Sequence, residues 1–73
     1  MTENMTYTER FSAELRSRRG FLDISQEELS EASGVNSRSI SQYENGTCSP
    51  TLTNVARLAD ALRCTPNDLL GWK

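Results

Sequence analysis

Apolar side chains recur along this chain at the spacing of amphipathic helices, and no stretch alternates as a β-strand does. The first apolar stripe consists of Phe11, Leu15 and Leu22. Before it stands Thr6-Tyr7-Thr8-Glu9, which has the form of a capping box, because Thr6 and Glu9 can each satisfy a backbone N–H group of the other. Together these signals predict a first helix over about residues 7–22.

Gly20 leaves the end of that helix open to two interpretations. A glycine inside a helix costs about 1 kcal/mol relative to alanine, so the helix could end at Arg19. We favour the longer helix, because Leu22 stays in phase with the stripe and Asp23 tolerates the left-handed conformation of a helix exit.

A second capping box, Ser25-Gln26-Glu27-Glu28, opens the next predicted helix, over about residues 26–33. Leu29 and Ala32 can face inward from this helix. Gly34 is expected to end it, because glycine readily takes the left-handed conformation just beyond a helix.

Asn36, a good N-cap, opens a third helix over about residues 37–45, and Gly46 closes it. Ile40 and Tyr43 are its apolar positions. The opposite face carries small polar groups, one arginine and one glutamine: Ser37, Arg38, Ser41, Gln42 and Asn45.

Thr51 can cap a fourth helix, whose apolar stripe repeats at about 3.6 residues. The stripe consists of Leu52, Val55, Leu58, Ala59 and Leu62. Thr65-Pro66, an N-cap followed by proline, opens a short fifth helix with Leu69 and Leu70 as its apolar residues. The sequence therefore predicts one all-α domain of five short helices over residues 6–73, after a flexible arm over residues 1–5.

The 73 residues suffice for one domain only, and so small a domain buries modest surface, which dimerisation would increase. The formal net charge of −2 is awkward for a DNA-binding protein, because neutralisation of phosphates supplies most non-specific affinity. Arginines crowd the first predicted helix and acidic residues the second, so composition neither supports nor forbids DNA binding. We interpret three of these arginines as solvated, with phosphate contact as the alternative: Arg10, Arg16 and Arg18.

This chain lacks the residues that several kinds of catalytic or metal site require. It has no histidine, and its two cysteines are too few for the usual four-ligand zinc site. Cys48 and Cys64 are expected to be unpaired thiols, although counting alone leaves a disulfide open. We see no nucleophile elbow and no phosphate-cradling glycine loop, so we predict no enzyme, no cofactor and no metal. Without an apolar run of membrane-spanning length or a signal segment, we expect no membrane partner and a cytoplasmic protein.

The two helices joined through Gly-Val-Asn carry the functional argument. The glycine allows a sharp turn, so the third helix crosses the second steeply and keeps its polar face free. In the DNA major groove an arginine such as Arg38 can pair with guanine, and a glutamine such as Gln42 with adenine. Gln26 begins the second helix, where its amide and the free N–H groups can meet a phosphate. The sequence therefore predicts a DNA-binding helix-turn-helix over residues 26–45.

Three motifs of this chain resemble those of the Cro/lambda-repressor family of helix-turn-helix domains, also called the XRE family. They are S-Q-E-E-L, G-V-x-x-x-x-I-S-x-Y-E-N-G and P-[ST]-L-x-x-[LV]-x-x-L-A-x-A-L. The resemblance covers about Phe11 to Leu70. It implies base contacts from Asn36, Ser37, Arg38, Ser41 and Gln42, and phosphate contacts from Gln26 and Asn45. It also implies a buried ion pair between Arg19 and Glu44 that ties the first helix to the third.

The chain departs from the family pattern at several positions. Ser30 and Ser33 replace residues that are usually apolar, and we expect them to bond to carbonyls of their own helix. Arg63 stands where glycine usually ends the fourth helix. The loop Thr47-Cys48-Ser49 lacks the usual basic residues, which predicts few phosphate contacts and a shallow dependence of binding on salt.

The resemblance implies a transcriptional regulator that binds a two-fold operator of double-stranded DNA as a homodimer. We expect the dimer to form through the fifth helix and the C-terminus, where Trp72 is either an interface anchor or a loosely packed terminal residue. Such a protein would associate with the nucleoid when bound to DNA. Two alternatives stay open: a protein-interaction module that keeps the fold without DNA binding, and the N-terminal DNA-binding domain of a longer repressor.

Overall fold

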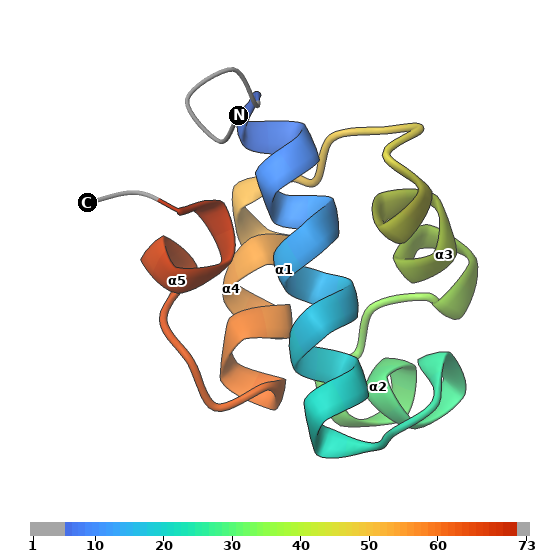
Figure 1. The fold of residues 1–73 in the computed structure, drawn as a ribbon. Helices are drawn as coiled ribbons and strands as arrows, with labels where there is room; N and C mark the ends of the chain where they lie inside the picture. The colour runs from blue at the N-terminus through green and yellow to red at the C-terminus, as the bar shows by residue number, and fades with distance from the viewer. Residues whose placement is uncertain (1–5, 72–73) are drawn as a thin grey trace.

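The computed structural model describes residues 6–71, so the predicted arm over residues 1–5 and Trp72 lie outside the described residues. Within residues 6–71 the regular structure is entirely helical, as predicted. The helices are α1 (Tyr7–Leu22), α2 (Gln26–Ser33), α3 (Ser37–Asn45), α4 (Leu52–Ala61) and α5 (Pro66–Leu70) (Figure 1).

The helices begin and end where local hydrogen bonds require it. Thr6 Oγ1 accepts from Glu9 N at 3.1 Å, while Thr6 N donates to Glu9 Oε1 at 2.8 Å. Ser25 and Glu28 make the same reciprocal pair at the start of α2. Asp23 takes a left-handed φ of 58°, and its N–H points at the last carbonyls of α1. The longer first helix is therefore confirmed.

Two departures from the family pattern have local explanations. Arg63 follows the end of α4 with a left-handed φ of 60°, the conformation for which glycine is the usual choice. Ser33 Oγ accepts a hydrogen bond from Val35 N at 3.1 Å. The serine thus binds the turn that follows α2, and our expectation that it bonds to a carbonyl of its own helix is wrong.

α1 lies at the centre of the arrangement, packed against α3 on one side and α5 on the other (Figure 1). α4 contacts α5 and α2, and α2 also contacts α3. No other described helix covers the outer side of α3, which forms an edge of the molecule (Figure 1). None of the described helices has the length and apolar content that crossing a membrane requires.

Every helix contributes side chains to one apolar core, and six of these are completely buried: Phe11, Leu15, Leu29, Ile40, Leu58 and Leu69. Burying one such side chain stabilises the fold by about 1.5–3 kcal/mol. Val35, in the turn between α2 and α3, is also buried, so the turn itself is packed against the core.

Three side chains that we expected to face the core do not. Leu52 is 85% exposed, because it is the first residue of α4 and the stripe reaches the core one turn later, at Val55. Leu22, the last residue of α1, is 40% exposed, and Ile24 packs against the core instead. Ala32 is exposed, since α2 buries only Leu29.

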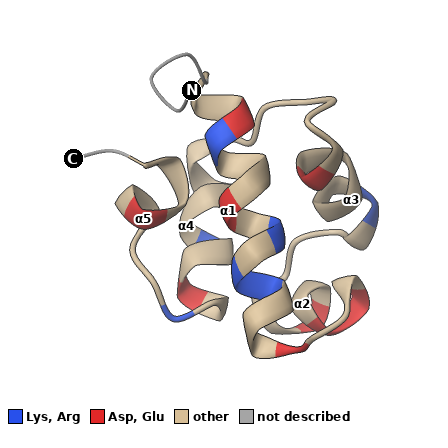
Figure 2. Ribbon diagram, viewed as in Figure 1, with Lys and Arg blue, Asp and Glu red and all other residues tan. Residues whose placement is uncertain are grey.

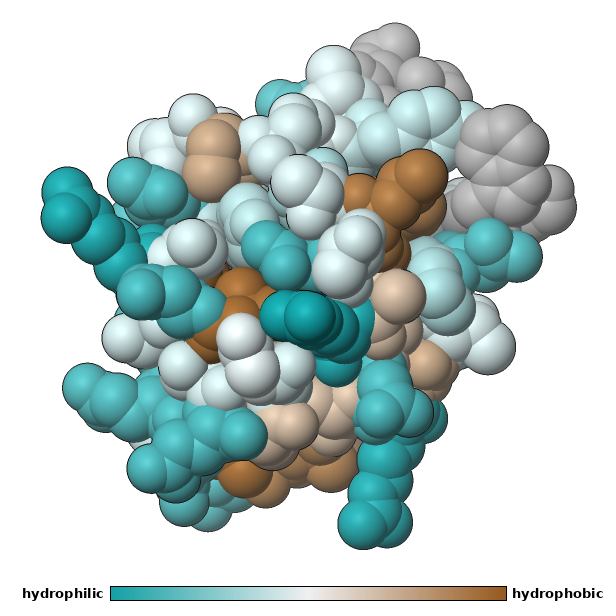
Figure 3. Space-filling model, turned by 180° about the vertical axis from the view of Figure 1, so that it is seen from behind, coloured by the Kyte–Doolittle hydropathy of each residue, from teal (hydrophilic) through white to brown (hydrophobic). Residues whose placement is uncertain are grey.

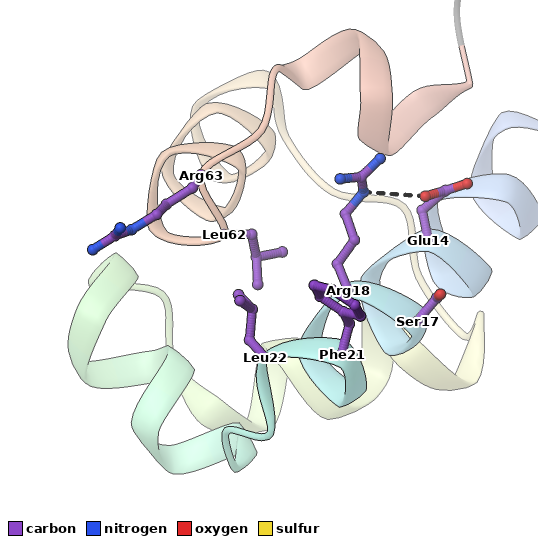
Figure 4. Close-up of a pocket in the computed structure, with 7 residues that line it drawn as sticks. All are labelled: Glu14, Ser17, Arg18, Phe21, Leu22, Leu62 and Arg63. Carbon is purple, nitrogen blue, oxygen red and sulfur yellow. Dashed lines mark hydrogen bonds and ion pairs between the residues drawn. The ribbon is translucent and has the colours of Figure 1, made fainter.

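The end of α1 and the connection from α4 to α5 enclose a shallow hollow of about 430 Å³. Leu62, which is buried, and Phe21, which is 89% exposed, both line it (Figure 4). An ion pair of 3.1 Å joins Arg18 Nε to Glu14 Oε1 beside it (Figure 4). No residue of α3 lines this hollow.

Candidate nucleic-acid interface

α3 is fixed from its inner side. Ile40 and Tyr43 are buried, and the Tyr43 ring packs edge-on against Phe11, with ring centroids 5.7 Å apart. The Tyr43 hydroxyl accepts a hydrogen bond of 2.8 Å from Asn54 Nδ2 on α4, and Ser12 Oγ on α1 donates to the Tyr43 carbonyl. These contacts from two neighbouring helices set the direction in which the outer side chains of α3 project.

The outer side of α3 brings together the residues predicted to read bases. Arg38 and Gln42 are exposed one turn apart, and Ser41 beside them is half-buried. Ser37 is half-buried at the first turn, and Asn45 is exposed at the last residue of the helix. Among residues 6–71, no hydrogen bond or ion pair engages the Arg38 guanidinium, so its donors are free for another molecule.

Two of the predicted base-contacting residues have roles within the protein as well. Asn36 Oδ1 accepts from Arg38 N at 2.7 Å, so its carbonyl caps α3 and its amide nitrogen remains available. Gln42 Oε1 lies 3.8 Å from Cys48 Sγ, which donates to it. The Gln42 carbonyl also accepts from Thr47 N at 3.0 Å. The loop after α3 therefore holds Gln42 at both its backbone and its side chain.

Arg19 and Glu44 form an ion pair where α1, α2 and α3 meet. Arg19 Nε lies 2.6 Å from Glu44 Oε2, and Arg19 Nη2 lies 3.0 Å from Glu44 Oε1. Arg19 Nη1 donates to the Ile24 carbonyl at 2.9 Å. The Glu44 side chain is 5% exposed and the Arg19 side chain 24%. Gln26, which we predicted to bind a phosphate, also belongs to this cluster, because its Nε2 donates to Glu44 Oε1 at 3.0 Å.

Glu44 is held in its ionised form. Burial raises the pKa of this carboxyl. The opposite effect is larger and comes from the hydrogen bonds of Arg19 and Gln26 and the positive charges of Arg19 and Arg16, so the pKa stays below its ordinary value. The hydrogen bond to Glu44 in turn raises the pKa of Arg19. Both groups are therefore charged at neutral pH.

Charge is distributed unevenly around α3. Glu27, Glu28 and Glu31 are exposed on α2, while α3 contributes one cation, Arg38 (Figure 2). Arg16 of α1 and Asn45 of α3 line one hollow between these helices, so a cation stands near the end of α3. Seen from behind, the edge that α3 occupies is mostly hydrophilic (Figure 3). This surface offers hydrogen-bonding groups more than positive charge.

Sequence reasoning missed several residues that orient α3. Ser12 is buried between Phe11 and Leu15 of α1. Its place beside these apolar residues was the only sequence signal that could have predicted its role. Asn54 carried no comparable signal, because only the fold brings it to the Tyr43 hydroxyl. The same holds for Cys48, whose contact with Gln42 depends on the path of the loop.

The remaining chemistry of the described residues is limited. Cys48 and Cys64 are both free thiols, and burial raises the pKa of Cys64. No group of histidine, cysteine, aspartate and glutamate side chains within residues 6–71 could hold a metal ion.

Comparison with known proteins identifies relatives of the whole described fold. A family model described as "Helix-turn-helix" matches residues 15–69. The HTH-type transcriptional regulator DicA of Escherichia coli (strain K12) is 36% identical over 69 residues, which are 94% of this chain and 48% of DicA. The chain thus spans about half the length of this curated relative.

A solved structure agrees with this result. The crystal structure of the P22 c2 repressor protein in complex with synthetic operator 9T, determined in the presence of Tl+, superposes with a TM-score of 0.77 and 34% sequence identity. The match covers 96% of this chain and 100% of that chain. The five-helix fold is therefore that of a phage-repressor DNA-binding domain, as the resemblance implied.

Proposed function

Because this chain belongs to the helix-turn-helix family, we propose that it is a sequence-specific DNA-binding transcriptional regulator that inserts α3 into the major groove. The observation that carries the proposal is the outer side of α3. There, the Arg38 guanidinium has no partner among the described residues, and Gln42 is oriented by the loop that follows the helix. The similar P22 c2 repressor, seen with a synthetic operator, supports the same use of the fold.

We assign base contacts to five residues of α3 and its cap: Asn36, Ser37, Arg38, Ser41 and Gln42. Arg38 suits the O6 and N7 acceptors of guanine, and Gln42 suits the N6 and N7 pair of adenine. Gln26 and Asn45, at the start of α2 and the end of α3, contact phosphates on either side. Arg16 shares the hollow beside Asn45, which favours phosphate contact for this arginine over a purely solvated role.

We propose that two copies bind a two-fold operator and pair through α5 and its surroundings. Leu52, 85% exposed, and Leu70, half-buried, line one apolar hollow with Tyr7 and Pro50. An exposed leucine beside a partly exposed α5 is the kind of surface that a second copy would cover. Leu52→Lys should lower the dimer fraction in sedimentation equilibrium and leave the helix content unchanged, whereas an unchanged dimer would rule out this face.

The relation to DicA bears on the alternative of a longer repressor, because DicA is about twice the length of the matched segment. The DNA-binding role proposed here is the same whether or not further domains follow. A protein-interaction module without DNA binding has no comparable support. In the cell we place the protein in the cytoplasm, on the nucleoid when bound to DNA.

Selection of bound sites from random double-stranded DNA tests the function directly. The expected result is an enriched palindrome whose half-sites lie about one helical turn apart. Arg38→Ala should lose enrichment of one guanine in each half-site. The proposal fails if no sequence is enriched at low salt, or if Arg38→Ala selects the same sites with the same affinity.

A further inference from the structure

Glu44 accepts hydrogen bonds from two side chains, those of Arg19 and Gln26. Arg19 of α1, whose side chain is 24% exposed, donates to both carboxylate oxygens. Gln26 lies at the first residue of α2, half-buried, and donates one Nε2 hydrogen to Oε1. Glu44 itself is only 5% exposed, so its carboxylate is largely shielded from solvent, whereas the Gln26 side chain that binds it is half-buried and still reaches solvent.

The chemistry of the carboxylate fixes the orientation of the Gln26 amide. An ionised carboxylate only accepts hydrogen bonds, so Gln26 must present its nitrogen, and not its oxygen, to Glu44. An amide nitrogen carries two hydrogens, and one remains after this bond is made. That hydrogen lies at the N-terminus of α2, where the free backbone N–H groups and the helix dipole also favour an anion.

Arg19 makes this arrangement compatible with a nearby phosphate. A carboxylate alone would repel the DNA backbone, but the two hydrogen bonds from Arg19 neutralise its charge within the cluster. Because the pair is held ionised at neutral pH, the acceptor for Gln26 is present in the folded protein at that pH.

We infer that Glu44, neutralised by Arg19, is a positioning residue for DNA binding: it orders the Gln26 amide so that its second N–H is offered to a phosphate. This inference rests on the proposed function and adds a role for the ion pair beyond tying α1 to α3. A side chain already ordered in the free protein loses less rotamer entropy on binding, which is worth about a 2- to 10-fold gain in affinity.

A double-mutant cycle tests the inference with a charge-neutral replacement. Arg19→Met/Glu44→Met removes the acceptor of Gln26, keeps the net charge at −2 and replaces a buried ion pair with apolar side chains of similar size, a change that is often tolerated. We expect it to weaken binding to specific and random DNA alike by about 2- to 10-fold per half-site. Gln26→Ala should have an effect of similar size, and adding it to the double replacement should then change little.

The control removes a like pair of charges elsewhere. Arg57→Gln/Asp60→Asn takes one cation and one anion from the exposed side of α4 and should leave affinity within about twofold. Fully additive effects of Gln26→Ala and Arg19→Met/Glu44→Met would overturn the inference. If the wild type enriches no DNA sequence at all, the proposed function fails first. If it binds a palindrome and Gln26→Ala binds equally well, the present inference and the phosphate contact assigned to Gln26 fail, while the DNA-binding function stands.

A measurement on the free wild-type protein makes the test independent of how the variants fold. In ¹⁵N-resolved NMR spectra, the two Gln26 side-chain amide protons should differ strongly in chemical shift, with one protected from solvent exchange by its bond to Glu44. Restricted side-chain motion at Gln26 before DNA is added supports the inference, whereas an amide as mobile as that of an exposed glutamine overturns it.

Discussion

Replacing Arg19 by methionine tests the energy of the ion pair with Glu44, because it removes the charge while keeping a long side chain. The Glu44 side chain is 5% exposed and Arg19 is 24% exposed. Removing one partner of a buried pair costs about 3–5 kcal/mol, since the other charge stays uncompensated. Solvent screening at the partly exposed Arg19 reduces this, so we expect Arg19→Met to lower the free energy of unfolding by about 2–4 kcal/mol at pH 7.

The loss should depend on pH in a defined direction. Burial raises the pKa of Glu44, but the hydrogen bonds from Arg19 and Gln26 keep it below the ordinary value of 4.5. A carboxyl with a lowered pKa in the folded state contributes stability above its unfolded-state pKa and loses it as the pH falls through the folded-state pKa. Without Arg19, burial dominates and Glu44 takes up a proton more readily. The difference between wild type and Arg19→Met should therefore be complete at pH 7, begin to shrink as the pH falls to the raised pKa of Glu44 in the variant, and shrink further below about pH 4.5, where the wild-type carboxyl becomes protonated.

Urea unfolding followed by circular dichroism at pH 7 and pH 3 measures this difference. The double replacement Arg19→Met/Glu44→Met serves as the control and should recover most of the lost stability, because no unpaired charge remains buried. The reasoning is wrong if Arg19→Met costs less than about 0.5 kcal/mol at pH 7, the range of an ordinary surface substitution, or if its cost is the same at both pH values.

Further substitutions separate the recognition surface from the core. Gln42→Ala should weaken the binding free energy by about 1–3 kcal/mol at one base pair and relax the base preference there. Competition with single-base operator variants measures this change. An equal loss of affinity for every sequence would contradict the base-contacting role. Leu58→Ala, in the completely buried core, should lower the free energy of unfolding by about 2–5 kcal/mol. Leu52→Ala, at a site that is 85% exposed, should change it by less than about 0.5 kcal/mol. Similar losses at the two sites would argue against the packing described. Phe21→Ser, at a site that is 89% exposed and away from α3, should leave both stability and DNA affinity unchanged, and a loss of affinity would show that the hollow beside Phe21 takes part in assembly or binding.

The helix boundaries could be predicted from the sequence because their signals are local. The box from Thr6 to Glu9 fixes its own hydrogen bonds without help from the rest of the fold. Asp23 at the end of α1 is likewise a short-range signal. Leu52 shows where such reasoning fails: an apolar stripe gives the direction of a helix face but not how far along the helix the core extends.

The candidate site could be located from the sequence but not described in detail. The spacing of Arg38 and Gln42 indicates that they share a face of α3, because helical periodicity determines it. The bond of Gln26 to Glu44 joins residues 18 positions apart, and the contact of Cys48 with Gln42 depends on the path of a loop. Both arise from the packed fold, so no local pattern could predict them.

The charge of the binding surface has a consequence for how this protein would select DNA. Each phosphate neutralised by a cation contributes about −0.9 to the slope of log K against log salt, whereas a neutral amide such as that of Gln26 or Asn45 releases no counterion. With Arg38 as the only cation on α3 and three glutamates exposed on α2, we expect attraction to random DNA to be weak, even with a phosphate contact from Arg16. Affinity for an operator then depends on hydrogen bonds whose geometry is fixed in advance, and on engaging two half-sites at once. Weak non-specific binding would therefore make the proposed ordering of Gln26 and the proposed pairing of two copies more important than they would be in a basic protein.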